Sequence, residues 1–182
     1  MNGQEPNAHE LVFDIRRSIR YHHRRCRHYL NIHNVVLFVA LVSNSAAFAA
    51  MWSGIIPSTS VLAALIPGLV ASLLIGFDFV TGSLRKSALH TDLARQFTEL
   101  EAQLVGVEEG DTEKLAEVQR ERLRIEATEP PILKVLDTLC YNDEVRAMGH
   151  EKDMRIQVGI VQKFVADFFD FGADSLYKTA NQ

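Results

Sequence analysis

Three adjacent polar residues lie in the middle of a long apolar stretch: Ser43, Asn44 and Ser45. At that depth of a membrane span, hydroxyl and amide side chains must face protein or water rather than lipid. Two chemistries fit them. One is a hydrogen bond across a helix–helix interface, worth roughly 0.6–2 kcal/mol. The other is the lining of a water-filled path, which needs several chains because one helical hairpin cannot enclose a pore.

The second half of the apolar stretch carries one acid and a set of small residues. The Asp78 carboxylate would stand at the cytoplasmic end of a second span. There it could ring a pore mouth and favour cations, or pair with an arginine of the preceding helix. The small residues recur at every fourth position: Ala64, Gly68, Ser72 and Gly76. Such a stripe lets another helix approach closely, so we expect it to pack against a neighbouring helix.

Four arginines recur on one face of a helix predicted before the apolar stretch: Arg17, Arg20, Arg24 and Arg27. The opposite face is apolar, as the spacing of three and four residues shows: Leu11, Ile15, Ile19, His22, Cys26 and Leu30. The guanidinium groups are suited to anionic lipid phosphates, with the apolar face against the bilayer edge or a neighbouring helix. Guanidinium forks also match the oxygens of a phosphate-bearing ligand, but the sequence alone favours the lipid interpretation.

Signatures of catalysis and metal binding are weak. His22 and Cys26 share a helix face, but the neighbouring arginines would repel a cation. The sequence has no glycine-rich phosphate loop after a strand, no nucleophile elbow and no paired histidines flanking a glutamate. We therefore expect a protein that is not an enzyme and that uses no cofactor and no metal.

The elements that must position these residues begin with the apolar stretch itself. From Asn34 to Phe77, 44 residues carry no Asp, Glu, Lys or Arg. As one helix this stretch would be about 66 Å long, roughly twice the hydrocarbon thickness of a bilayer. Gly54 and Pro57 predict a turn near its midpoint. We expect two membrane spans, about 35–52 and 61–80, because the polar remainder of the chain could not cover a buried soluble hairpin.

Charge predicts the orientation of the hairpin. Six arginines precede the first span, Arg85 and Lys86 follow the second, and the turn between the spans is uncharged. By the positive-inside rule both termini are cytoplasmic. Residues 81–182 hold 13 Lys or Arg and 19 Asp or Glu, a net charge of −6, which argues against non-specific binding of DNA or RNA. Cys26 and Cys140 would lie on the cytoplasmic side of the membrane, which is reducing, so we expect free thiols.

The fold class expected is all-α, in three parts. These are a basic amphipathic helix in residues 1–33, the two-span hairpin in 34–80 and a cytosolic helical domain in 81–182. Within the last part, a helix of about 112–127 begins with Asp111 as its cap and ends before Pro130 and Pro131, and a shorter helix follows over about 132–140.

Two apolar seams run along the cytosolic domain. The first consists of Leu89, Leu93, Phe97, Leu100 and Leu104. The second lies in a last long segment and consists of Met154, Val158, Val161, Val165 and Phe168. Seams with spacings of three and four residues indicate self-association or a compact bundle, and the pattern does not choose between them.

The order of these parts resembles the SLATT family, two-span effectors associated with nucleotide-signalling partners in bacterial defence. The likeness also includes FTELEAQL at residues 97–104 and EPPILKVLDTLCYND at 129–143. It implies a pore or ion channel in the bacterial inner membrane that opens on phage infection, depolarises the cell and causes abortive infection. It further implies control by a nucleotide or oligonucleotide signal from a separately encoded nucleotidyltransferase.

We expect a homo-oligomer and favour a tetramer. The 182 residues contain no fused nucleotide sensor or synthase, so sensing would fall to the chain's own helices or to a partner. The alternative function is a membrane-anchored helical scaffold that recruits a cytosolic partner through its seams. A pure anchor would not need polar residues at mid-membrane, and one span would serve it.

Overall fold

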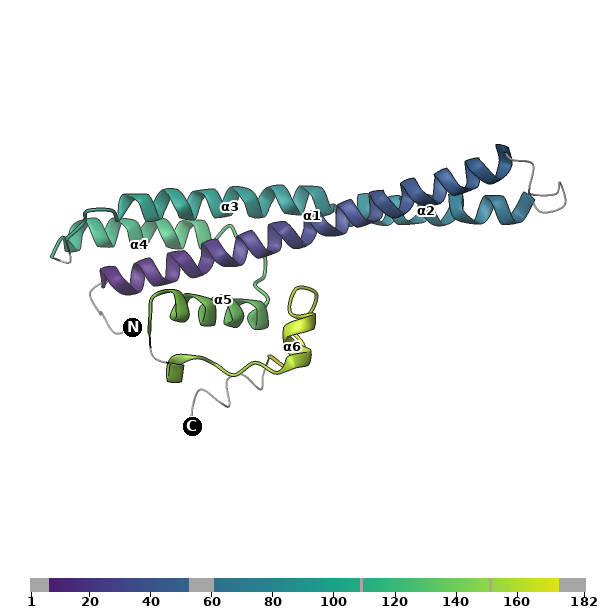
Figure 1. The fold of residues 1–182 in the computed structure, drawn as a ribbon. Helices are drawn as coiled ribbons and strands as arrows, with labels where there is room; N and C mark the ends of the chain where they lie inside the picture. The colour runs from purple at the N-terminus through teal and green to yellow at the C-terminus, as the bar shows by residue number, and fades with distance from the viewer. Residues whose placement is uncertain (1–6, 53–60, 109, 151, 174–182) are drawn as a thin grey trace. The chain divides into compact units, whose positions relative to one another are not determined.

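The computed structural model describes residues 7–52, 61–108, 110–150 and 152–173. Within these residues most of the chain is helical and none of it forms a strand, which confirms the all-α class (Figure 1). The elements are α1 (Ala8–Trp52), α2 (Val61–Thr81), α3 (Ser83–Gln103), α4 (Thr112–Glu126), α5 (Lys134–Ala147), the 3-10 turn η2 (Lys152–Met154) and α6 (Ile160–Val165).

The chain forms two compact units. Unit 1 comprises residues 1–25 and 90–182, and unit 2 comprises residues 26–89. Both boundaries fall inside long helices, α1 and α3, so each of these helices contributes to both units. Each unit is described by itself below.

The larger core of unit 1 forms where the start of α1 meets α3 and α4, which lie along one side of it in Figure 1. Its buried residues are Leu11, Ile15, Leu93, Phe97, Leu100, Leu104, Leu115, Val118 and Ile125. Four of the five residues of the first predicted seam are in this list. That seam therefore closes a bundle within one chain. Leu89, the fifth, is exposed, and His90 takes its place in the buried stripe.

The local signals that bound α4 behave as predicted. The Asp111 side chain accepts a hydrogen bond from the backbone N–H of Lys114 at 3.1 Å and caps the helix. The helix ends at Glu126, ahead of Pro130 and Pro131. Proline lacks an N–H donor and pushes the preceding residue out of the helical region, so the chain cannot continue as a helix there.

Two predictions for the C-terminal third are wrong. The helix expected over 132–140 runs from Lys134 to Ala147, because its buried face continues through Glu144 and Val145. The last segment does not keep the helical period of its predicted seam, because residues 155–159 are not helical and separate η2 from α6. The Asn142 side chain holds this stretch by accepting from Ile156 N at 2.8 Å and donating to Ile156 O at 2.7 Å.

A second core in unit 1 lies on the side of α1 that faces α5. It consists of Tyr21, Val135, Leu136, Cys140, Ala166 and Ala173, with Leu133, Leu139, Ile156 and Val158 packed against it. Of the second predicted seam, Val158 contributes to this core, whereas Met154, Val161 and Phe168 are exposed. The non-helical backbone at residues 155–159 removes the helical register on which that seam was based.

Unit 2 contains the second half of α1, α2 and the beginning of α3. Two small buried residues, Ala40 on α1 and Ala71 on α2, let these two helices pack closely. Gly82 separates α2 from α3 with a left-handed φ of 64°, which a side-chain-bearing residue rarely adopts. Within the described residues, one helical stretch, Ile66–Gln103, is long and apolar enough to cross a membrane. The predicted turn between the spans, residues 53–60, lies outside the described residues.

Candidate functional site

Three of the four predicted arginines form ion pairs with the acidic face of α5 in unit 1. Arg17 Nε lies 3.1 Å from an Asp137 oxygen, Arg24 Nη2 lies 3.6 Å from an Asp143 oxygen, and Arg20 binds Glu144. The fourth, Arg27, belongs to unit 2 and is exposed. Each of the first three arginines has a carboxylate partner on α5, and binding of lipid phosphates or of a phosphate-bearing ligand by these arginines stays a prediction. These ion pairs join α1 to α5.

Glu144 is the most deeply buried of these carboxylates. Its side chain is 1% exposed, whereas that of Arg20 is 43% exposed. A carboxylate out of water requires a paired cation and hydrogen bonds, so Arg20 is the group that permits Glu144 to be buried charged. This ion pair anchors the last turn of α5 to α1.

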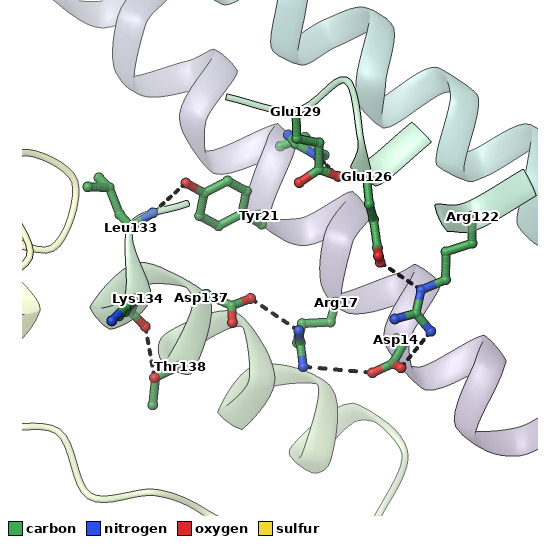
Figure 2. A network of polar contacts seen from close by, with 11 residues as sticks. Asp14, Arg17, Tyr21, Arg122, Glu126, Glu129, Leu133, Lys134, Asp137 and Thr138 are labelled. Carbon is green, nitrogen blue, oxygen red and sulfur yellow. Dashed lines mark hydrogen bonds and ion pairs between the residues drawn. The ribbon is translucent and has the colours of Figure 1, made fainter. Parts of the chain in front are cut away.

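Arg17 also belongs to a chain of charges that reaches α4, shown in Figure 2. Asp14 lies between two guanidinium groups, 3.7 Å from Arg17 and 2.7 Å from Arg122. Arg122 in turn binds Glu126, one turn further along α4, at 2.7 Å. Burial raises the pKa of Asp137, and the Arg17 charge opposes that shift. The network lines one side of a polar cleft of about 460 Å³.

Tyr21 closes this cleft and orders the start of α5. Its hydroxyl oxygen accepts a hydrogen bond from the backbone N–H of Leu133 at 2.9 Å (Figure 2). Burial raises the pKa of Tyr21 to about 12, so the hydroxyl stays protonated at physiological pH. The contact supplies a partner for an N–H in the segment that follows the two prolines.

A buried pair of histidines lies in the same unit. His22 Nδ1 and His90 Nδ1 are 3.0 Å apart, and His22 Nε2 lies 3.1 Å from a Glu129 oxygen. The His22 ring stacks on Phe97, with centroids 5.6 Å apart. Because an ionised carboxylate only accepts, His22 Nε2 donates to Glu129, its Nδ1 accepts, and His90 Nδ1 donates. Burial lowers the pKa of His90 to about 4, and the positive charge of Arg25 acts in the same direction.

The residues considered for a metal have other partners. Cys26 Sγ lies 3.4 Å from Ser87 Oγ, while His22 faces His90 and Glu129. No group of three or more His, Cys, Asp or Glu side chains suited to a metal ion occurs within the described residues. Cys26 and Cys140 are both free thiols, as expected.

In unit 2, the polar triplet lies on a largely open face of α1. Asn44 and Ser45 are exposed and Ser43 is half-buried. The Asn44 amide donates to the backbone oxygen of Ala40 at 2.9 Å, and its oxygen lies 4.0 Å from where a side chain at Gly68 would begin. Asn44 therefore satisfies its donor on its own helix while its carbonyl end lies beside α2.

Asp78 pairs with a histidine and not with an arginine. His33 Nδ1 on α1 lies 2.6 Å from an Asp78 oxygen on α2, and the Asp78 residue is 7% exposed. A neighbouring groove of about 760 Å³ has Val36, Phe79 and Leu84 among its lining residues. In one chain the carboxylate thus links the two helices of the hairpin instead of standing free at its end.

Only part of the predicted small-residue stripe faces α1. Gly68 faces Asn44, while Ser72 and Gly76 are exposed and a side chain at Gly76 would meet nothing within 4 Å. The side chain of Ala64 lies outside what the structure describes. The α2 contact with α1 runs instead through Gly68, Ala71 and Asp78.

Sequence reasoning missed His90, Glu129 and Glu144 as partners. A signal for His90 existed, since a polar residue three positions before Leu93 and seven before Phe97 continues the buried stripe. No local signal marks the other two. Comparison of the chain with protein-family models, with curated proteins and with solved structures gives no match, so the functional interpretation rests on these residues.

Proposed function

We propose that the chain is a two-span membrane protein that assembles into an ion channel. In this proposal α1 from about residue 35 and α2 are the spans, both termini are cytoplasmic, and several copies, with a tetramer favoured, surround the pore. The resemblance to SLATT proteins extends the proposal to an effector of bacterial anti-phage defence in the inner membrane. A nucleotide or oligonucleotide signal from a separate nucleotidyltransferase would regulate it.

The apolar surface of unit 2 supports membrane insertion of both helices. Large side chains are exposed along α1 and α2: Val35, Leu37, Phe38, Leu41, Val42, Leu69, Leu73, Phe77 and Phe79. Soluble monomers rarely expose contiguous apolar patches of this extent, whereas lipid acyl chains would cover them without cost.

The observation that carries the channel proposal is the exposure of Asn44 and Ser45 among those apolar side chains. Polar side chains at mid-membrane are unfavourable against lipid, so in the bilayer they must meet another chain or water. A single hairpin offers neither. Assembly of several hairpins around a polar path provides both, with the small exposed residues Ser72 and Gly76 as a surface for close helix contact.

The continuity of α1 supports regulation from the cytosolic side. One helix of 45 residues, Ala8–Trp52, carries the arginines that pair with α5 and also the polar triplet. We propose that a change at the arginines reaches the polar triplet through this one helix.

Ion flux from proteoliposomes tests this function. Asn44→Leu should lower the flux at least tenfold without reducing insertion, because it adds an apolar side chain to a span. Val42→Leu, on the same helix, is the matched control and should conduct like the wild type. Asp78→Asn keeps a polar contact to His33 but removes a charge, so it should reduce cation selectivity in the reversal potential. Wild-type flux in the Asn44→Leu protein would remove Asn44 from the pore lining, and absence of flux from the wild type would contradict the channel proposal.

A membrane-anchored scaffold is the second candidate, and one observation favours it. Unit 1 exposes apolar side chains near its C-terminal end: Ile160, Val161, Phe164, Phe168, Phe169 and Phe171. A partner protein could cover them. If this is the function, the purified protein should conduct no ions in any state, and Phe164→Ser should abolish partner recruitment in cells while leaving membrane localisation intact.

A further inference from the structure

A second cleft in unit 1, of about 520 Å³, lies between α5 and the non-helical stretch that follows it. Four of its lining residues are cations, Arg24, Arg146, Arg155 and Lys163, and one is an acid, Asp143. The cleft therefore has a side-chain charge of about +3. The surplus is local, because residues 81–182 together carry a net charge of −6. A positive cleft in an acidic domain attracts small anions more than it attracts nucleic acid polymers.

The guanidinium groups in this cleft have unused donors. Arg24 Nη1 and Arg155 Nε are buried, and neither has an acceptor among the described residues. A buried donor without a partner costs roughly 1–3 kcal/mol, more when it is charged, so an acceptor that binds in the cleft would remove this cost. The two donors come from α1 and from the stretch after η2, which the fold brings to one cleft.

The backbone around the cleft is held in place independently of any ligand. Both hydrogen bonds between the Asn142 side chain and Ile156 fix the non-helical stretch against α5, next to Arg155. Asp143 lies 3.6 Å from Arg24 and 2.8 Å from Arg146 and orients both guanidinium groups. A site whose cations are already positioned loses less conformational entropy on binding an anion.

We propose that this cleft, defined by Arg24, Arg146, Arg155 and Lys163, binds a small ligand with at least two negative charges on adjacent phosphate groups. Guanidinium forks match phosphate oxygens, and one phosphate would neutralise only part of the charge in the cleft. Its volume is within the range of ligand sites and exceeds the space that one phosphate fills. The ligand is either soluble or the headgroup of an anionic phospholipid. The proposal does not depend on whether the protein conducts ions.

The test uses the full-length protein in nanodiscs. In the first arm, inorganic pyrophosphate is titrated by calorimetry in zwitterionic lipid. In the second arm, native mass spectrometry counts diacylglycerol pyrophosphate, a phospholipid with two adjacent phosphates, retained from nanodiscs that contain it. Arg155→Gln combined with Lys163→Gln should weaken pyrophosphate binding at least tenfold, and Asp143→Asn should strengthen it severalfold by removing the acid. Arg124→Gln, an exposed arginine outside the cleft, is the matched control and should bind like the wild type.

Each outcome bears on the proposal. Saturable pyrophosphate binding that follows this order of variants supports a soluble ligand. Lack of pyrophosphate binding, together with diacylglycerol pyrophosphate that the wild type retains and the double variant loses, supports a lipid headgroup in the same cleft. Absence of both, or binding that is equal in the wild type and the double variant, overturns the proposal. Because Asp143→Asn is expected to gain affinity, misfolding of the double variant could not produce the predicted pattern.

Discussion

The ion pair between Arg20 and Glu144 should be the largest single electrostatic contribution to the stability of unit 1. Replacing Arg20 with Gln leaves a carboxylate that is 1% exposed without its cation. Removal of one partner of a buried pair costs about 3–5 kcal/mol. We therefore expect a loss of about 3 kcal/mol.

Cys140 provides the assay, because it is 0% exposed and lies on the same helix as Glu144. Burial raises its pKa to about 12, so labelling by N-ethylmaleimide requires α5 to open. Where closing is fast relative to labelling, the rate follows the open population. A loss of about 3 kcal/mol then speeds Cys140 labelling roughly 100-fold, measured on peptides by mass spectrometry so that Cys26 is resolved separately.

Two variants make the comparison specific. Arg17→Gln removes a cation from the same helix whose α5 partner, Asp137, is 28% exposed, so it should cost about 1 kcal/mol and speed labelling about fivefold. Adding Glu144→Gln to Arg20→Gln removes the unpaired charge and should restore much of the protection. If Arg17→Gln and Arg20→Gln speed labelling equally, burial of the carboxylate does not determine the cost, and the reasoning fails.

Two further predictions concern pH and topology. Because the pKa of His90 is lowered to about 4, the folded chain binds fewer protons than the unfolded chain between about pH 6.5 and 4. Stability should fall over that window by at most about 3 kcal/mol in thermal unfolding, and His90→Gln should remove most of the dependence; an unchanged pH profile in that variant would contradict the assignment. For topology, an impermeant maleimide added outside intact cells should label Ser58→Cys and not Ser175→Cys, and equal labelling of both would refute the two-span orientation.

The sequence predicted the structure best where the signal lies in residues close together along the chain. Helix α4 was predicted nearly to the residue, because Asp111 and the two prolines determine its ends without help from the rest of the chain. The first seam was predicted from spacing alone, since Leu93, Phe97, Leu100 and Leu104 repeat with the helical period. The spacing did not show whether this seam packs within one chain or between copies, because that depends on where α1 and α4 pack.

Contacts across long stretches of sequence could not be predicted. The Arg20–Glu144 pair joins residues 124 positions apart, and each member alone resembles any exposed helix charge. The arginines were therefore interpreted through what they could bind outside the chain. The C-terminal segment was predicted wrongly for the same reason. Its apolar spacing fits a helix, but the hydrogen bonds between Asn142 and Ile156, 14 positions away, hold a non-helical backbone there. Tertiary contacts override a weak local preference.

The division of the small-residue stripe leads to a prediction about assembly. In one chain Gly76 is exposed, and a side chain there would meet nothing within 4 Å. Gly76→Leu should therefore leave the hairpin intact, and it should even favour the helix, since glycine is a poor helix former. If close contact at Gly76 joins the copies, the larger side chain should separate them and weaken association at least tenfold.

Subunit counting by photobleaching in liposomes measures this directly, with ion flux recorded on the same samples. Val70→Leu, on α2 but outside the stripe, is the control for added volume and should retain the wild-type subunit number. A Gly76→Leu protein that is monomeric and does not conduct would tie conduction to assembly through α2. Wild-type subunit number in that variant would exclude the exposed part of the stripe from the interface and leave the apolar groove beside Asp78, lined by Val36, Phe79 and Leu84, as the surface through which copies meet.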